Sequence, residues 1–138
     1  MSGPSDLLYV DSSFWIAQGM RRDARFAEAR SLSEAYVGAP VATSNLVVGE
    51  TWSFLRRREG CAVAMQWLDR VRGQTRVSIE RVTPELEDEA WAWLRVHDER
   101  PYSFVDATSF ALMRRLGISG ALAFDGDFAA AGFVELRP

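Results

Sequence analysis

Short apolar runs alternate with longer helical stretches along this 138-residue chain, and that alternation restricts the possible folds more than any other feature. Each run is short enough for a buried strand and is followed by a polar residue. The predicted strands are residues 7–10, 40–43, 75–82, 120–124 and 133–136. Because helical stretches separate them, the sequence predicts an α/β fold with right-handed crossovers and a central, mostly parallel sheet flanked by helices.

Capping residues and glycines indicate where the helices begin and end. Ser12 or Ser13 is expected to cap a first helix that runs through Met20, and Ser44 or Asn45 is expected to cap a later, long one. The long helix is predicted over residues 46–58. Other helices are predicted over residues 22–36, 61–72 and 104–116, the last of them capped by Ser103, with a single turn at 127–131. A further helix starts at Pro84 behind the hydroxyl of Thr83.

The length and composition are those of one globular domain, residues 1–138. Cys61 has no second cysteine to pair with and precedes an apolar run, so we expect it to be a small core residue. Residues 1–6 carry neither the basic nor the apolar part of a secretion signal. No stretch approaches the ~20 apolar residues of a membrane span. We therefore expect a cytoplasmic protein.

Two aspartates directly follow predicted strands. Asp11 ends the run Leu8-Tyr9-Val10, and Asp125 ends the run that closes with Phe124. In an open α/β sheet, ligands bind beyond the carboxyl ends of the strands. If these two strands are neighbours in the sheet, Asp11 and Asp125 face one crevice.

Two further acids lie on predicted helices. Glu50 shares a helix face with Leu46 and Phe54, and Asp106 shares one with Phe110 and Met113, so both are expected to point toward the core. Carboxylates rarely lie beside apolar surface without a partner. Each acid taken singly is explained well enough as a helix cap, an ion-pair partner or an edge-of-core residue, but several in one small chain favour a shared site.

Carboxylates that converge need cations nearby. Two like charges about 4 Å apart repel by roughly 4 kcal/mol at an effective dielectric constant near 20. Oxygen ligands suit Mg²⁺ or Mn²⁺, and such an ion makes bound water a nucleophile for phosphodiester hydrolysis, with a second ion able to steady the leaving oxygen. We expect Asp11 and Asp106 to be direct ligands, and Glu50 and Asp125 to complete the shell or orient the water. Asp127 either joins them or caps the helix it begins.

The basic residues are unusual because all 16 are Arg and none is Lys, although the formal net charge is −3. GC-rich coding explains this bias most simply. Arg nevertheless presents a planar fork that suits phosphate and stacks on bases. Local clusters at residues 21–25, 56–58 and 114–115 around an acidic centre fit a metal-dependent nuclease better than a nucleic-acid coat protein, although charge runs are often plain solvated surface.

Several other site classes are excluded. The Asp125-Gly126-Asp127 start is not an EF-hand loop, because the fifth and sixth loop positions hold Ala129 and Ala130. The single His97 excludes a His-rich zinc site. The chain has no nucleophile elbow, no Walker A motif and no dinucleotide-binding glycine motif. A receiver domain of a response regulator relies on a lysine, which this chain lacks.

In four places the sequence resembles the PIN-domain nucleases, and among them the VapC-like toxin ribonucleases of bacterial toxin–antitoxin pairs. The matching pieces, in order, are Val10-Asp11-Ser12-Ser13, the stretch from Thr43-Ser44-Asn45-Leu46 to Glu50, Asp106-Ala107-Thr108-Ser109, and Phe124-Asp125-Gly126-Asp127-Phe128. Each piece alone recurs by chance. Their order, approximate spacing and the total length agree with the family over essentially the whole chain.

The resemblance implies a three-layer α/β/α fold, Mg²⁺- or Mn²⁺-dependent endoribonuclease activity, a homodimer and inhibition by a small VapB-like antitoxin. It implies that Asp11, Glu50, Asp106 and Asp125 are the family's acidic quartet. Asp127 matches a position that is often acidic, and Ser12 and Asn45 match polar positions near the metal that would meet the substrate. An aromatic groove involving Trp52, Trp67, Trp91 or Trp93 is one place for an antitoxin segment. The alternative is a PIN-like module that binds RNA or protein without cutting.

Overall fold

The central sheet confirms the predicted α/β fold. A computed structural model describes residues 7–138, and within them the sheet has five strands in the order β3-β2-β1-β4-β5, all parallel. The strands are β1 (Leu8–Val10), β2 (Val41–Ser44), β3 (Val77–Glu80), β4 (Gly120–Leu122) and β5 (Val134–Glu135). Residues 1–6, where no secretion signal was expected, lie outside the described residues.

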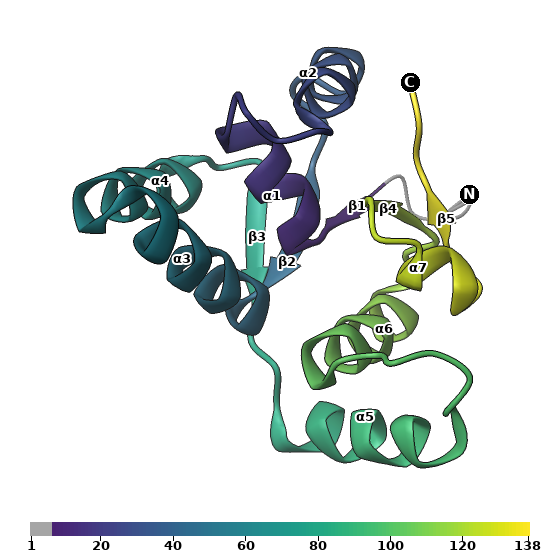
Figure 1. The fold of residues 1–138 in the computed structure, drawn as a ribbon. Coiled ribbons are helices and arrows are strands. Elements are labelled where there is room, and N and C mark those ends of the chain that lie inside the picture. Colours follow the sequence, from purple (N-terminus) through teal and green to yellow (C-terminus); the bar gives the residue numbers. More distant parts are fainter. Residues whose placement is uncertain (1–6) are drawn as a thin grey trace.

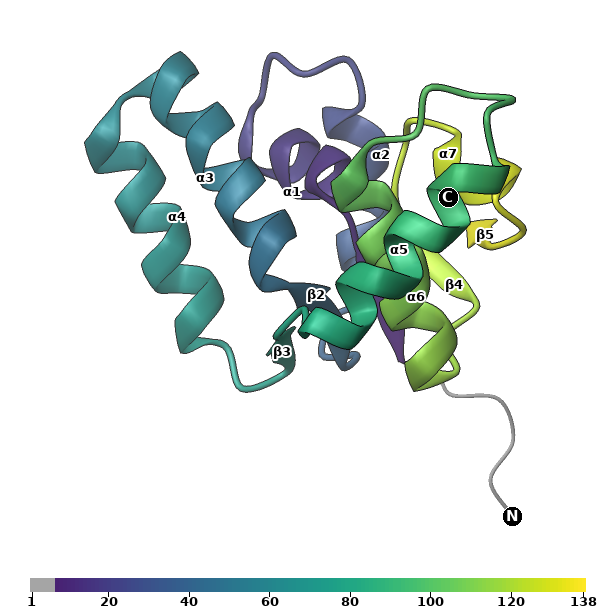
Figure 2. The same cartoon turned by 90° about the horizontal axis from the view of Figure 1, so that it is seen from below.

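Helices cover both faces of this sheet. They are α1 (Ser12–Gly19), α2 (Phe26–Ala35), α3 (Asn45–Glu59), α4 (Cys61–Gly73), α5 (Pro84–Val96), α6 (Phe104–Leu116) and α7 (Asp127–Ala130). Figure 1 shows α1 to α4 on one side of the sheet and α5 and α6 on the other. In Figure 2, α3 and α4 run side by side as a hairpin, and α5 lies against α6. The arrangement is a three-layer α/β/α fold.

Most helix ends follow the predicted capping chemistry. The Ser44 hydroxyl accepts the Val47 N–H at the start of α3, and the Thr83 hydroxyl accepts the Leu86 N–H at the start of α5. Ser103 caps α6. Gly60 and Gly117 end helices with φ of +94° and +69°, a backbone region that side chains with a Cβ rarely adopt.

Three local predictions were wrong. The cap of α1 is Asp11, whose carboxylate accepts the Ser13 N–H, and not Ser12 or Ser13. Helix α2 begins at Phe26 and not at residue 22, because the N–H groups of Asp23 and Phe26 bond to carbonyls in tight turns. Cys61 is exposed. It is the first residue of α4, which turns other residues, such as Ala64 and Trp67, toward the core.

An aromatic core ties the second helix layer to the sheet. Phe110 of α6 is fully buried and packs against Phe128, Phe133 and Trp93. The buried Tyr9 hydroxyl of β1 shares a hydrogen bond of 2.8 Å with the Ser109 hydroxyl. These contacts hold the middle of α6 against β1. None of the helices within residues 7–138 is long and apolar enough to cross a bilayer.

Candidate active site

The two strands that precede Asp11 and Asp125 are neighbours, as the shared-crevice prediction required. Strand β1 pairs with β4, with Val10 opposite Leu122, and the Asp11 N–H donates to the Leu122 carbonyl at 3.1 Å. The chain leaves β1 for α1 on one face of the sheet and leaves β4 toward α7 beside β5 (Figure 1). This is the topological switch point at which open α/β sheets bind their ligands.

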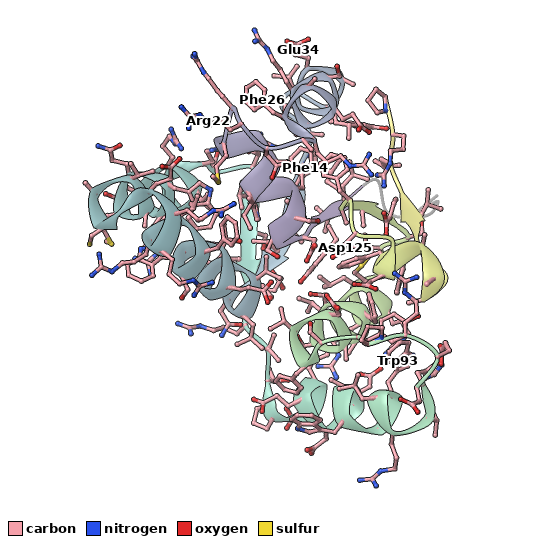
Figure 3. All side chains as sticks on the ribbon, viewed as in Figure 1. Phe14, Arg22, Phe26, Glu34, Trp93 and Asp125 are labelled. Carbon is pink, nitrogen blue, oxygen red and sulfur yellow. The ribbon has the colours of Figure 1, made fainter. Side chains whose placement is uncertain are left out.

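Three carboxylates meet at this point. Asp106, Asp125 and Asp127 each place an oxygen within 4.8 Å of the others, and we call these three residues the acidic group. Asp106 comes from the first turn of α6, Asp125 comes from the connection between β4 and α7, and Asp127 is the first residue of α7. Figure 3 shows Asp125 in the space between α1 on one side and α6 and α7 on the other.

Local hydrogen bonds hold these side chains in place. The Asp106 carboxylate accepts the Ser103 N–H at 3.0 Å, while the Ser103 hydroxyl accepts the Asp106 N–H at 2.9 Å. One Asp125 oxygen accepts the Asp127 N–H at 3.1 Å. The capping box of α6 therefore orients one member of the acidic group, and the turn before α7 orients another.

Asp11 lies next to the acidic group and is almost completely buried, with 2% of its surface exposed. One of its oxygens accepts the N–H and the hydroxyl of Ser13, at 3.2 and 2.8 Å. Burial raises the pKa of Asp11 to about 7, and the charges of Asp125 and Asp106 add to the rise. The charges of Asp125 and Asp106 therefore disfavour ionisation of the Asp11 carboxyl.

The other acids are also hard to ionise together. Burial raises the pKa of Asp106 to about 6, with a further contribution from the charges of Asp125 and Asp127. Burial likewise raises the pKa of Asp125, and Asp127 again adds to the effect. A divalent cation would favour the ionised forms of all these carboxylates, so the residues fit a site for a hard cation with oxygen ligands.

Glu50 lies at the edge of this arrangement and is exposed, so the expectation that it faces the core was wrong. The reason is that α3 turns this side chain toward the Ser12 hydroxyl, which donates to Glu50 Oε1 at 2.6 Å. Burial raises the pKa of Tyr9, and the charges of Asp11 and Glu50 add to the rise. Ser12 joins Glu50 to the segment that carries Asp11.

Arg100 is a site residue that the sequence did not reveal. Its Nε and Nη2 donate to Asp127 Oδ1 at 3.0 and 2.9 Å, and Nη2 also reaches the Asp125 carbonyl at 3.4 Å. Asp127 does not cap α7, because the capping position is Gly126. Arg100 follows Glu99 in the connection between α5 and α6, and no periodicity or motif marks it.

Asn45 connects two segments of the chain. Its side-chain oxygen accepts the Val82 N–H at 2.8 Å and so ties α3 to the segment that follows β3. It also lines a cavity of about 630 Å³ between α3, α4 and β3, together with Trp52, Arg72 and Arg81. The residues that line this cavity include none of the acids described above.

Comparison with known proteins places this geometry in a family. A family model described as PIN domain matches residues 8–134. The chain is 54% identical over 134 residues to the 23S rRNA-specific endonuclease VapC20 of Mycobacterium tuberculosis, in strains CDC 1551 and H37Rv, and the match covers 96% of this chain and 99% of that protein. The crystal structure of M. tuberculosis VapC20, described as a Sarcin-Ricin loop cleaving toxin, superimposes with a TM-score of 0.89 at 53% identity and covers 95% of this chain and 99% of that one.

Proposed function

The chain belongs to the PIN-domain family, and from this membership and the acidic group we propose that it is a metal-dependent endoribonuclease that acts as the toxin of a toxin–antitoxin pair. The observation that carries the proposal is the convergence of Asp106, Asp125 and Asp127 beside the buried Asp11, at the switch point of the sheet. A site made of carboxylates alone suits phosphodiester hydrolysis with a bound cation better than chemistry that needs a nucleophilic side chain.

We propose Mg²⁺ or Mn²⁺ as the cofactor, with Asp11 and Asp106 as direct ligands and with Glu50, Asp125 and Asp127 around them. Carboxylate oxygens are the preferred ligands of these cations. When bound, the cation would lower the pKa of its water and stabilise charge on the phosphate. The carboxylates supply negative charge to this site, and they are those of Asp11, Glu50, Asp106 and Asp125. Ser12 orients Glu50, and Ser13 orients Asp11. Arg100 holds Asp127.

RNA is the proposed substrate, and ribosomal RNA is the first substrate to test, because the related VapC20 is a 23S rRNA-specific endonuclease. We also propose a homodimer and a small VapB-like antitoxin as partners, and the cytoplasm as the compartment. One candidate binding site for an antitoxin segment is the cavity lined by Trp52 and Asn45. Asn45 and Ser12 remain proposed substrate contacts.

A PIN-like module that binds RNA or protein without cutting is the rival proposal. It predicts that substitution of an acid in the group leaves RNA binding and biological effect unchanged. The grouping of three carboxylates within 4.8 Å speaks against it, because such a group costs stability unless a cation is used there.

Asp106→Asn beside the parent protein separates the two proposals. We expect the variant to stay folded by circular dichroism, because an asparagine oxygen still accepts the Ser103 N–H. It should bind Mn²⁺ more weakly in calorimetric titration and lose cleavage of total RNA and of purified ribosomes by at least about 10²-fold. Asp88→Asn, an exposed acid on α5, is the matched control and should behave as the parent. Equal cutting by parent and Asp106→Asn would remove Asp106 from the mechanism.

A further inference from the structure

An open groove adjoins the acidic group and extends away from it. Its volume is about 300 Å³. It shares Ser13 and Asp125 with the candidate active site, and its remaining walls come from α1, the α1–α2 connection, α3 and Phe124. We call it the Arg25 groove, after the cation on its rim. Because the groove begins at Asp125, a polymeric ligand whose backbone lies at the acidic group would continue into the groove.

One face of α3 leads from the acids into this groove. Glu50, Phe54 and Arg58 follow each other at intervals of four residues, which places them in a row along the helix. Glu50 is held by Ser12 at the acidic end, and Phe54 lines the groove. The Arg58 guanidinium lies 5.2 Å from the centre of the Phe54 ring. The row therefore runs from an acid through an aromatic ring to a cation.

Arg25, from the connection between α1 and α2, supplies a second cation. Its side chain is 45% exposed, and its guanidinium lies 5.5 Å from the centre of the Phe124 ring. Nη1 pairs with Glu28 at 2.7 Å, and within residues 7–138 the other guanidinium nitrogens make no hydrogen bond. Those free N–H groups and the planar fork suit a phosphate oxygen.

The remaining lining indicates that a phosphate alone does not fill the groove. Ile16 and Phe54 are apolar, and Asp23 is acidic and would repel a free anion. One Asp23 oxygen accepts the Arg25 backbone N–H at 2.8 Å. A nucleotide matches this mixture, because its base can stack on an aromatic ring while its phosphate pairs with Arg.

We propose that the Arg25 groove binds one unstacked nucleotide of RNA beside the bond that is cut, with its base against Phe54 and Ile16 and its phosphate on Arg25. The inference rests on the proposed ribonuclease function and adds to it a subsite that selects single-stranded substrate. Proteins that bind single strands combine stacking on aromatic rings with a positively charged track for the backbone in this way.

Binding of a fluorescently labelled single-stranded RNA oligonucleotide, measured by anisotropy with EDTA present so that no cutting occurs, tests the subsite. Phe54→Leu should weaken binding by about tenfold, and Phe54→Trp should retain it. Trp91→Leu is the control, because Trp91 is half exposed on α5 and takes no part in the groove. Arg25→Gln should weaken binding and lower the slope of log affinity against log salt by about one, whereas Phe54→Leu should leave that slope unchanged. Arg30→Gln, on α2, should do neither.

Unchanged RNA affinity in both Phe54→Leu and Arg25→Gln, with a parent that binds and cuts RNA, would overturn the subsite and leave the ribonuclease proposal intact. A parent that neither binds nor cuts RNA would overturn both. If the two substitutions spared RNA binding and instead weakened self-association in sedimentation, the groove would be a contact between copies of the chain and the subsite would be wrong.

Discussion

Asp11 combines two properties that conflict in a protein without a bound cation. It is buried, and it faces Asp106 and Asp125. Burial and like charge both favour the protonated acid, and together they raise its pKa to about 7. In the unfolded chain the same carboxyl titrates near 4. Between these values the native state holds protons that the unfolded state has released.

That difference sets the sign of the pH dependence. From about pH 4 to about pH 7 the native state binds more protons than the unfolded state, so the free energy of unfolding should fall as pH rises. We expect the protein in EDTA to unfold at lower urea concentration at about pH 8 than at about pH 5. Asp11→Asn should reduce this loss and make the protein more stable at about pH 8. Asp88→Asn should keep the parent's pH dependence, and a parent whose stability rises over this range would contradict the argument.

Arg100 partly neutralises the Asp127 carboxylate, which a bound cation would contact. Both Nε and Nη2 bind the same oxygen, Asp127 Oδ1, so a cation that uses this oxygen must compete with the guanidinium. Arg100→Ala should therefore tighten Mn²⁺ binding, by up to about tenfold, which is the order of the interaction between charges a few Å apart in water. Calorimetric titration measures it. The loss of stability should be small, because the pair is partly exposed and screened by solvent.

Arg100→Lys should bind Mn²⁺ much as the parent does, because it keeps the positive charge. Weaker binding by Arg100→Ala would show that the guanidinium orders Asp127 as a ligand and does not compete with the cation.

The Arg100–Asp127 pair also shows what the sequence cannot predict at the scale of single residues. Asp127 was identified as a possible ligand, but its partner lies 27 residues earlier in a connecting segment with no pattern.

Among the helices and strands, α6 is the element in which the stability of the fold and the position of an acidic-group residue depend most directly on the same side chain. Its capping box uses the Asp106 carboxylate, which is also a member of the acidic group. Ser103→Ala removes the hydroxyl that accepts the Asp106 N–H and should cost about 1 kcal/mol in the free energy of unfolding. It should also weaken Mn²⁺ binding, though less than Asp106→Asn does, because the carboxylate stays but loses part of its support.

Thr83→Ala is the matched control, because Thr83 caps α5 in the same way, through the Leu86 N–H at 3.3 Å, and lies outside the acidic group. It should cost a similar amount of stability in urea and leave Mn²⁺ binding unchanged. Equal weakening of Mn²⁺ binding by both variants would mean that the effect comes from lost stability and not from the position of Asp106.

Elements were predictable where their ends depend on local chemistry. Thr83-Pro84 and Ser103 mark helix starts whatever the rest of the chain does, and both predictions are confirmed. The start of α2 was wrong because residues 20–26 form turns whose hydrogen bonds carry no periodicity. Glu50 was assigned to the core side because its apolar neighbours set the face, whereas its own side chain reaches Ser12 at the edge of a cleft.

At the scale of the whole molecule, the acidic site depends on the order of strands, which differs from their order in the sequence. Strand β4 lies beside β1, although β2 and β3 come between them along the chain. The rule on switch points predicted a crevice shared by Asp11 and Asp125 only if these two strands are neighbours, and the sequence left the strand order open. The exposed sides of the site were not predictable, because Arg100 and Arg25 come from connections that only the folded chain brings next to the site.

The toxin proposal is tested by the whole protein in a cell. Expression of the parent should arrest growth of a bacterial host, and Asp11→Asn should not, because the acidic site would lose one of its charges. This substitution is well suited to the test. Asparagine still accepts the Ser13 N–H as a helix cap, and the variant is expected to be at least as stable as the parent near neutral pH. Loss of arrest would then report lost chemistry and not misfolding. Asp88→Asn should arrest growth as the parent does. Arrest by Asp11→Asn at equal protein level would show that the effect comes from binding, as the rival proposal of a non-cutting module requires.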